Sequence, residues 1–313
     1  MRHELAFVFP GQGSQFPGMG KDIAARFPAA RRTFDQIDAA LGFSISELCF
    51  EGPEEELRMT ANTQPAILAV SAAIHAVIKA EVSRRPDVVA GHSLGEYSAI
   101  VAAGGLTAED AARLVNARGR FMQEAVPAGE GAMAAIIGPS LEEVQAICEV
   151  ASEGEILSPA NINGPGQIVI AGARRAVDRA IDEAKRRGVR KAVLLPVSAP
   201  FHCALMKSAE ERLQPLLEEA PFQNLEMPLV SNVDASPIGT DHAIRNALKR
   251  QVVSPVRWVD SVQRMVEMGV KRFVEIGPGT VLTGLIKRID PSVELVNVRD
   301  VASLEAFLAA SRP

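Results

Sequence analysis

The chain has 313 residues, of which 47% are hydrophobic and 23% are charged. This composition is typical of a globular protein and excludes a disordered or fibrous chain. The formal net charge of −5 disfavours a general nucleic-acid-binding protein, because such a protein needs a basic face to neutralise phosphates.

The three cysteines, Cys49, Cys148 and Cys203, are widely spaced and form no CxxC pair. We therefore expect neither a disulfide framework nor a bound metal. The apolar run Leu5–Phe9 is too short for the core of a signal peptide, and charges interrupt every longer apolar run. We expect no membrane segment, and a reducing cytoplasm as the compartment.

Short buried strands alternate with helices along most of the chain. The predicted strands are brief, apolar and followed by Gly-rich or polar turns: Leu5–Phe9, Val88–Ala90, Pro228–Ser231, Phe273–Ile276 and Val293–Val298. Helical patterns lie at Pro65–Lys79, Ala108–Gln123, Val259–Met268 and Thr280–Lys287. This alternation predicts a mostly parallel sheet covered on both faces, with functional residues beyond the carboxyl ends of its strands.

A different pattern occupies the middle of the chain. Its predicted elements are a strand, a helix, two strands around a turn at 163–166, a helix and a strand: Ala132–Ile137, Leu141–Glu149, a segment before the turn, Gln167–Ala171, Ala176–Arg187 and Val189–Leu195. The order β-α-β-β-α-β is that of a ferredoxin-like domain. The sequence therefore predicts an α/β fold. A hydrolase-like large domain, residues 1–127 and 198–313, has a mostly parallel sheet, and a small ferredoxin-like domain, residues 128–197, is inserted in it.

The strongest local motif is Gly-x-Ser-x-Gly at residues 91–95, between a predicted strand and a helix. Gly91 and Gly95 suit a turn so sharp that residues two before and two after the serine have little room for a side chain. Ser93 would then lie at a helix start, where free N–H groups favour negative charge. We interpret Ser93 as a nucleophile and the Leu94 N–H as an oxyanion donor. The alternative is a chance match in a Gly-rich turn.

A serine hydroxyl needs a base near neutral pH, and the chain has five histidines. His202 is the best-placed candidate because it follows the serine in chain order, as the base does in hydrolase-like elbows. Of the others, His3 is terminal and His75 lies in a helical pattern. His92 is expected to pack structurally, and His242 stands in a polar stretch before a helix.

No Asp or Glu between Ser93 and His202 stands in an obvious turn after a strand of the large domain. A backbone carbonyl could orient the base in place of a carboxylate. Cys203, next to the candidate base, has two interpretations, a catalytic thiol or a small buried residue, of which the second is commoner.

The helix at Ala108–Gln123 has an apolar stripe at spacing i, i+4, i+7, i+11, formed by Ala111, Val115, Arg118 and Met122. An arginine on a core-facing stripe needs an anion, because burying an unpaired guanidinium is costly. Two partners stay open. One is a core carboxylate in an internal ion pair, and the other is a substrate carboxylate held by the two-pronged guanidinium.

Five separated stretches of the chain, two of them around Ser93 and Arg118, resemble the malonyl-CoA:acyl carrier protein transacylases and the related acyltransferase domains of polyketide synthases. The resemblance runs almost end to end. It is carried by Phe9–Gln15, Gly91–Ala99, Arg118-Gly119, Ala160–Gln167 and Glu275–Gly279.

The resemblance implies a role for each matching residue. Ser93 would carry the acyl group as an ester, with His202 as general base and then general acid. Gln12 would supply the second oxyanion N–H, opposite Leu94. The backbone carbonyl of Gln251 would orient the ring of His202.

Three more residues would contact the substrate. Arg118 would pair with the free carboxylate of malonate, and Asn163 lies in a family-like stretch assigned to substrate binding. Phe201 stands where many fatty-acid enzymes of this family have Ser and many malonyl-selective polyketide enzymes have Phe. We expect its ring to disfavour the α-methyl branch of methylmalonyl.

The implied activity is ping-pong transfer of malonyl from malonyl-CoA to the phosphopantetheine thiol of acyl carrier protein, for fatty acid biosynthesis, by a monomer that needs no cofactor. The alternatives are a polyketide malonyl acyltransferase, a serine esterase or thioesterase, and a non-catalytic scaffold. The basic run Lys185–Lys191 is either a docking surface for the acidic carrier protein or a solvated helix end with cations suited to the dipole.

Overall fold

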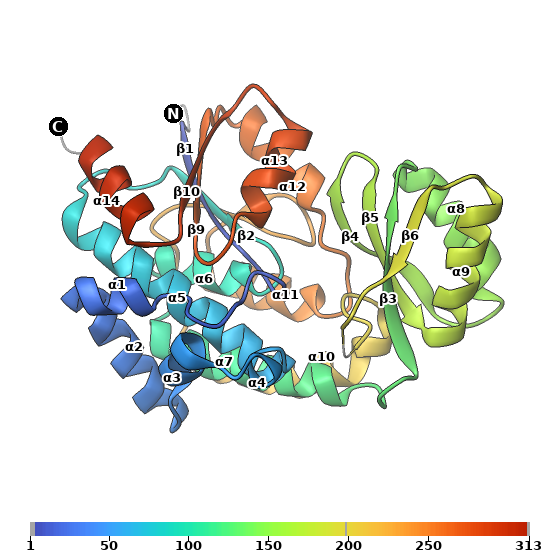
Figure 1. The fold of residues 1–313 in the computed structure, drawn as a ribbon, viewed down its shortest axis with the longest axis horizontal. Coiled ribbons are helices and arrows are strands. Elements are labelled where there is room, and N and C mark those ends of the chain that lie inside the picture. The colour runs from blue at the N-terminus through green and yellow to red at the C-terminus, as the bar shows by residue number, and fades with distance from the viewer. Residues whose placement is uncertain (1–3, 198, 312–313) are drawn as a thin grey trace.

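The computed structural model describes residues 4–197 and 199–311. His3 and Ser198, which begins the second predicted segment of the large domain, lie outside the described residues. Two sheets organise the described chain (Figure 1). A six-stranded sheet has the order β10-β9-β1-β2-β7-β8, and a four-stranded sheet has the order β4-β5-β3-β6.

The elements have the following bounds. The strands are β1 Leu5–Phe9, β2 Val88–Gly91, β3 Gly131–Ile137, β4 Leu157–Gly164, β5 Gln167–Ala173, β6 Lys191–Leu194, β7 Leu229–Val230, β8 Pro237–Ile238, β9 Arg272–Ile276 and β10 Glu294–Val298. The helices are α1 Lys21–Arg26, α2 Pro28–Leu41, α3 Ile45–Glu51, α4 Glu54–Leu57, α5 Thr60–Glu81, α6 Gly95–Ala102, α7 Ala108–Glu124, α8 Leu141–Ser152, α9 Arg174–Arg186, α10 Lys207–Glu219, α11 Asp241–Gln251, α12 Trp258–Glu267, α13 Val281–Ile289 and α14 Val301–Ala310.

The large sheet is parallel from β10 to β7, and only β8 runs antiparallel to its neighbour. Strand β1 is buried on both faces. Phe7 and Phe9 pack into an apolar cluster with residues of α2, α5 and α7, whereas Ala6 and Val8 pack into a second cluster with residues of α12 and α13. Burial on both faces explains why β1 is continuously apolar, and the predicted α/β class is confirmed.

The four-stranded sheet is antiparallel throughout, and α8 and α9 pack on it around a separate apolar cluster. Counted along this unit, its strands have the spatial order 2-3-1-4, as the β-α-β-β-α-β pattern predicts. Figure 1 shows this unit beside the large sheet. Strand β4 joins the two units, because Ile162 N–H donates to the Val256 carbonyl and Val256 N–H donates to the Ala160 carbonyl, each at 2.9 Å. The domain limits at 128 and 197 stay a prediction.

Several elements differ from the prediction. Helix α5 begins at Thr60 rather than Pro65, because the buried helix tolerates a proline that lacks one helical hydrogen bond. Strand β7 shortens to two residues, and His242 lies inside α11 rather than before it. Helices α1 to α4 and α10 and strand β8 were not among the predicted elements, and α11 was expected only as a helix after His242, without bounds.

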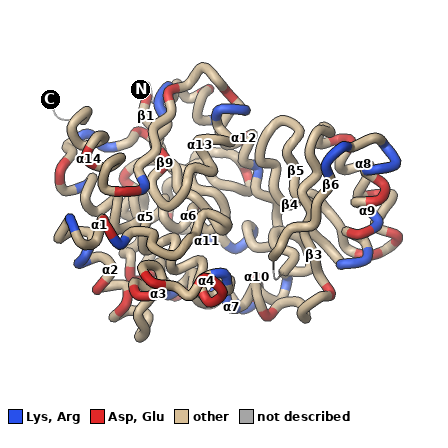
Figure 2. The backbone as a smooth tube through the Cα atoms, in the orientation of Figure 1, with Lys and Arg blue, Asp and Glu red and all other residues tan. Residues whose placement is uncertain are grey.

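Helix α5 also corrects the expectation that no segment is long and apolar enough to span a membrane. Thr60–Glu81 meets that description by length and composition. Its most apolar 18-residue window is 83% buried inside the protein, as is typical of a core helix. Figure 2 shows charges of both signs interspersed on outer helices such as α9, where Arg174 pairs with Asp178.

Candidate active site

Ser93 lies on a sharp turn between β2 and α6, with its backbone in the left-handed region at φ 54°. The flanking glycines are required by space. A Cβ on Gly91 would lie 1.9 Å from the carbonyl carbon of Gly95, and a Cβ on Gly95 would lie 2.1 Å from the Phe9 oxygen. The geometry is therefore that of the predicted elbow, which lifts the serine above the carboxyl edge of the sheet.

Asn232 holds both sides of this elbow, and the sequence analysis missed it. Its Oδ1 accepts a 2.7 Å hydrogen bond from Ser93 N–H, and its Nδ2 donates a 2.6 Å bond to the Gly91 carbonyl. Asn232 follows the short strand β7 and is fully buried. An asparagine in a turn after a strand is common, so only its partners distinguish it.

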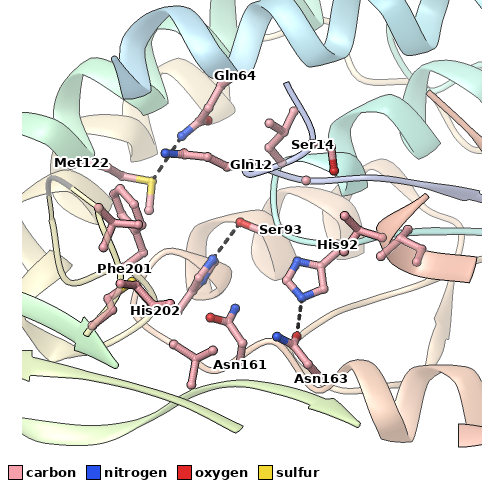
Figure 3. Close-up of a pocket in the computed structure, with 18 of the residues that line it drawn as sticks. Gln12, Ser14, Gln64, His92, Ser93, Met122, Asn161, Asn163, Phe201 and His202 are labelled. Carbon is pink, nitrogen blue, oxygen red and sulfur yellow. Dashed lines mark hydrogen bonds between the residues drawn. The ribbon is translucent and has the colours of Figure 1, made fainter. Parts of the chain in front are cut away.

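Ser93 and His202 face one another across the site (Figure 3), with Ser93 Oγ 2.7 Å from His202 Nε2. The other ring nitrogen, Nδ1, lies 2.9 Å from the Gln251 backbone carbonyl. Burial, and then the positive charge of Arg118, lower the pKa of His202 to about 3. The ring is therefore neutral near pH 7. Because Nδ1–H must donate to the carbonyl, Nε2 is left to accept from the Ser93 hydroxyl.

Arg118 lies in the core with 1% of its surface exposed, as its place on the apolar stripe predicts. Nη1 donates to Gln64 Oε1 at 2.8 Å, and Nη2 donates to Gln251 Oε1 at 2.9 Å and to Ser93 Oγ at 3.2 Å. Within the part of the chain that the structure describes, these partners are all neutral, and Nε has none. A direct internal ion pair, one of the two open interpretations, is therefore absent from these residues.

Glu96 is a second residue that the sequence analysis missed. Its carboxyl is completely buried and accepts hydrogen bonds from Gln251 Nε2 and, at 3.4 Å, from Asn232 N–H. The Gln251 side chain also donates to the Ser93 carbonyl at 3.0 Å. Gln251 thus contacts the base, His202, through its backbone carbonyl. Its side chain contacts the backbone of the nucleophile, Arg118 and Glu96.

A cavity of about 200 Å³ opens beside Ser93. Gln12 and Leu94, the predicted oxyanion residues, both line it, and Gln12 Nε2 donates to Thr60 Oγ1 at 3.3 Å. Phe201 also lines it and is 8% exposed. All the residues predicted to contact substrate therefore surround one space, but their individual roles stay predictions.

Asn163 lines the same cavity from β4, where its Oδ1 lies 2.7 Å from His92 Nε2 (Figure 3). The ring of His92 packs against Trp258 with centroids 5.7 Å apart, as expected of a structural histidine. His92 nevertheless also lines the cavity, which the sequence analysis did not predict. Cys203 is buried and burial raises its pKa to about 11, which favours the core interpretation over a reactive thiol.

The chain matches a family model over nearly its whole length. The model is that of the acyl transferase domain, and it matches residues 6–304. Together with the α/β fold and the serine, histidine and arginine around one cavity, this match defines the class: the protein is an acyltransferase.

Its relatives narrow the class. The chain is 48% identical to the malonyl CoA-acyl carrier protein transacylase of Escherichia coli (strain K12), covering 97% of this chain and 99% of the relative. It is 46% identical to that of Bacillus subtilis (strain 168), covering 96% and 95%. It therefore belongs to the malonyl CoA-acyl carrier protein transacylase family.

Solved structures agree with this placement. An acyl carrier protein S-malonyltransferase from Vibrio cholerae superposes with a TM-score of 0.95 at 48% identity, covering 97% of this chain and 99% of that one. A malonyl-transacylase solved in complex with a type II PKS acyl-carrier protein also has a TM-score of 0.95 at 48% identity, covering 98% and 99%.

Proposed function

We propose that the protein transfers malonyl from malonyl-CoA to the phosphopantetheine thiol of acyl carrier protein, for fatty acid biosynthesis, through an ester on Ser93. One observation carries the residue assignment. Ser93 Oγ is 2.7 Å from a neutral His202 and 3.2 Å from the buried cation of Arg118. This arrangement around one oxygen supports Ser93 as the nucleophile, His202 as the base and Arg118 as the site for a carboxylate.

In the first half-reaction, Ser93 Oγ attacks the thioester carbonyl carbon while its proton moves to His202 Nε2. The negative oxygen of the tetrahedral intermediate accepts hydrogen bonds from the backbone N–H groups of Leu94 and Gln12. The C–S bond then breaks, and the proton on Nε2 passes to the departing sulfur of CoA. The Gln251 carbonyl stabilises the protonated ring through Nδ1–H.

In the second half-reaction, the phosphopantetheine thiol gives its proton to His202 Nε2 and its sulfur attacks the ester carbon. The bond from that carbon to Ser93 Oγ breaks, and Oγ takes the proton back. Throughout, Arg118 holds the free carboxylate of the malonyl group, which fixes the acyl chain in the cavity. Asn163 and Phe201 complete the wall that contacts the substrate.

A second candidate, a malonyl acyltransferase of polyketide synthesis, is favoured by two observations. One is Phe201 in the cavity wall. The other is the 48% identity to a transacylase solved with a type II PKS acyl-carrier protein. The two functions share chemistry and differ in the carrier protein. A hydrolase is less well supported, because water would not require the buried cation of Arg118.

The basic run at 185–191 remains a candidate docking surface for the carrier protein. Lys185 pairs with Asp182, and Arg186 and Arg187 pair with Glu183, which supports a solvated helix end for these three cations. A cytoplasmic location and a monomeric state stay predictions.

The test follows both half-reactions. Incubation with malonyl-CoA should add one malonyl group to the intact protein, located on Ser93 by peptide mass spectrometry, and Ser93→Ala should take up none. Addition of a holo-carrier protein should then move the label to its thiol. Rapid release of malonate into water with no transfer would contradict a transferase, and labelling at another residue would contradict Ser93. Comparing fatty-acid and polyketide carrier proteins separates the two pathways.

A further inference from the structure

A buried carboxyl and the buried arginine of the site are joined through one amide. Arg118 Nη2 donates to Gln251 Oε1, and Gln251 Nε2 donates to Glu96 Oε2. Both ends of this chain are almost completely buried, with Glu96 at 0% and Arg118 at 1% exposure. An isolated charge at either end would be costly, so each compensates the other across the Gln251 side chain.

The substrate would change this balance. In the substrate-free protein, one cation and one anion share the buried cluster. If a malonyl carboxylate binds Arg118 directly, the cluster contains one cation and two anions. A second negative charge in a desolvated site favours protonation of the anion that is not in direct contact with the cation. That anion is Glu96.

Glu96 has a suitable oxygen for the proton. Oε2 accepts from the Gln251 amide, whereas Oε1 accepts only the long 3.4 Å contact from Asn232 N–H. Burial raises the pKa of Glu96 to about 7, against the opposing effects of Gln251, Asn232 and Arg118. At pH 7.5 the Glu96 carboxyl is therefore mostly ionised, yet close enough to its midpoint to take up a proton when a second negative charge enters the site.

Other charged groups face Glu96 from each element around it. Arg118 is on α7, Tyr97 is the next residue on α6, and Asp234 follows β7 while Arg250 is on α11. Asp234 and Arg250 form an ion pair with each other, so their charges largely cancel at Glu96. Tyr97 is neutral near pH 7 because burial raises its pKa further above the usual range. Arg118 thus has the dominant uncompensated charge near Glu96.

We propose that Glu96 is the counter-ion of Arg118 in the substrate-free enzyme and takes up a proton from solvent when a carboxylate-bearing acyl group binds Arg118. This rests on the proposed function. Glu96 acts through Gln251 and does not touch the substrate, so it is a positioning residue. Its proton uptake keeps the buried cluster of Arg118, Glu96 and the acyl carboxylate close to neutral.

The test measures protons on acylation. Formation of the Ser93 ester from a thioester releases CoA as a thiol and is itself proton-neutral below the pKa of the thiol. Calorimetry at pH 7.5 in buffers of different ionisation enthalpy should therefore show uptake of roughly half a proton or more per malonyl-enzyme. The methyl ester of malonyl-CoA, which has no free carboxylate, should show none.

Variants assign the proton to a residue. Glu96→Gln keeps an oxygen acceptor for Gln251 Nε2 but removes the charge, so it should form malonyl-enzyme without proton uptake. The matched control is Glu210→Gln, which neutralises a carboxyl that is 5% exposed and paired with Lys207 outside the cavity. It should retain the uptake seen in the unmodified protein. Uptake that persists in Glu96→Gln would overturn the proposal.

The pH dependence of malonyl-enzyme formation tests the same proton uptake. Because binding takes up a proton, the equilibrium constant for malonyl-enzyme formation should rise as pH falls from 8 to 7, a range below the thiol pKa of about 8.5, by up to about tenfold. Glu96→Gln should flatten this dependence. A wild-type constant that does not change with pH would count against the coupling.

Infrared difference spectra of the wild-type protein serve if Glu96→Gln does not fold. Malonylation should produce a protonated-carboxyl band that does not move when the malonyl group is labelled with ¹³C, and its absence would overturn the proposal. The mass of the acyl-enzyme distinguishes a failure of the proposed function from a failure of the role proposed for Glu96. If Ser93 carries no malonyl, the proposed function fails, whereas a malonylated Ser93 without proton uptake rejects only the role of Glu96.

Discussion

Ser93 and His202 share a 2.7 Å Oγ–Nε2 hydrogen bond while both have backbones in the left-handed region, at φ 54° and φ 60°. Such conformations in non-glycine residues cost on the order of 1–3 kcal/mol each and persist only where neighbours hold them. Asn232 holds the serine from the turn after β7, and the Gln251 carbonyl holds the histidine from the end of α11. The reacting pair therefore depends on contacts far away in the sequence.

Asn232→Ala should lower kcat for malonyl transfer by roughly 10- to 100-fold, with a smaller change in KM. The substitution removes two hydrogen bonds to the elbow, worth about 1–3 kcal/mol together, and the strained Ser93 loses its support. Steady-state kinetics with malonyl-CoA and carrier protein would measure it. Asn246→Ala, which removes an exposed bond to Arg250, is the control and should leave both constants unchanged. Equal kinetics for the two variants would contradict the role of Asn232 in holding the elbow.

Arg118→Ala should reduce kcat/KM for malonyl-CoA by about 100-fold and raise the activity with acetyl-CoA relative to malonyl-CoA. The malonyl carboxylate loses a charge-assisted partner, while Ser93 and His202 stay in place. Competition between the two thioesters, read as masses of acyl-enzyme, gives the ratio. The control is Arg113→Ala, on the exposed side of the same helix and paired with Asp110. Unchanged malonyl selectivity in Arg118→Ala would reject the carboxylate site.

Phe201→Ser should increase acylation by methylmalonyl-CoA relative to malonyl-CoA by about tenfold or more. The ring lines the cavity, and one extra methyl group in a tight apolar site is worth about 1–3 kcal/mol. Rates of acyl-enzyme formation with each thioester measure the change, and Phe201→Leu should fall between the two. A ratio that does not respond to side-chain size would show that Phe201 does not select against the branch.

The free energy of unfolding should fall as pH decreases from 7.5 to 4.5, partly because of His75. This ring packs edge-on against Phe7 and Phe9, and burial lowers its pKa to about 4. The folded pKa is below the unfolded value of about 6.5, so the unfolded chain binds the proton first. The contribution of the neutral His75 ring to the free energy of unfolding is fully present above pH 6.5 and is lost as the pH falls towards 4.

Urea unfolding at the two pH values would measure this loss, which for His75 is on the order of 2 kcal/mol. His75→Leu should reduce the difference between the two pH values by that amount, whatever its effect at pH 7.5. His242→Leu alters an exposed histidine and should leave the difference unchanged. Equal pH dependence in wild type and His75→Leu would contradict the role of the buried ring.

Local sequence patterns predicted much of the fold. Brief apolar runs followed by turns identified β1, β2, β9 and β10, because strands buried in a parallel sheet are short and continuously apolar. The prediction missed α3 and the two-residue strand β8, and it made β7 too long. Elements this short have too few residues to show a periodic pattern. Helix α5 begins five residues before the predicted start at Pro65, because a proline inside a buried helix has the same local pattern as a proline in the first turn of a helix.

By itself, the sequence determined the elbow at Ser93 and the inward position of Arg118. Glycine spacing and helical periodicity are local properties, so they can be read directly from the residues. Only the tertiary structure decided which residues hold the Ser93 backbone in place and which compensate the charge of Arg118. Asn232 and Glu96 look like an ordinary turn residue and an ordinary acidic residue of a helix's first turn. The hydrogen bonds that join them to Gly91, Ser93, Gln251 and each other span 136 to 155 positions of the chain, and they form only when the sheet and its helices pack together.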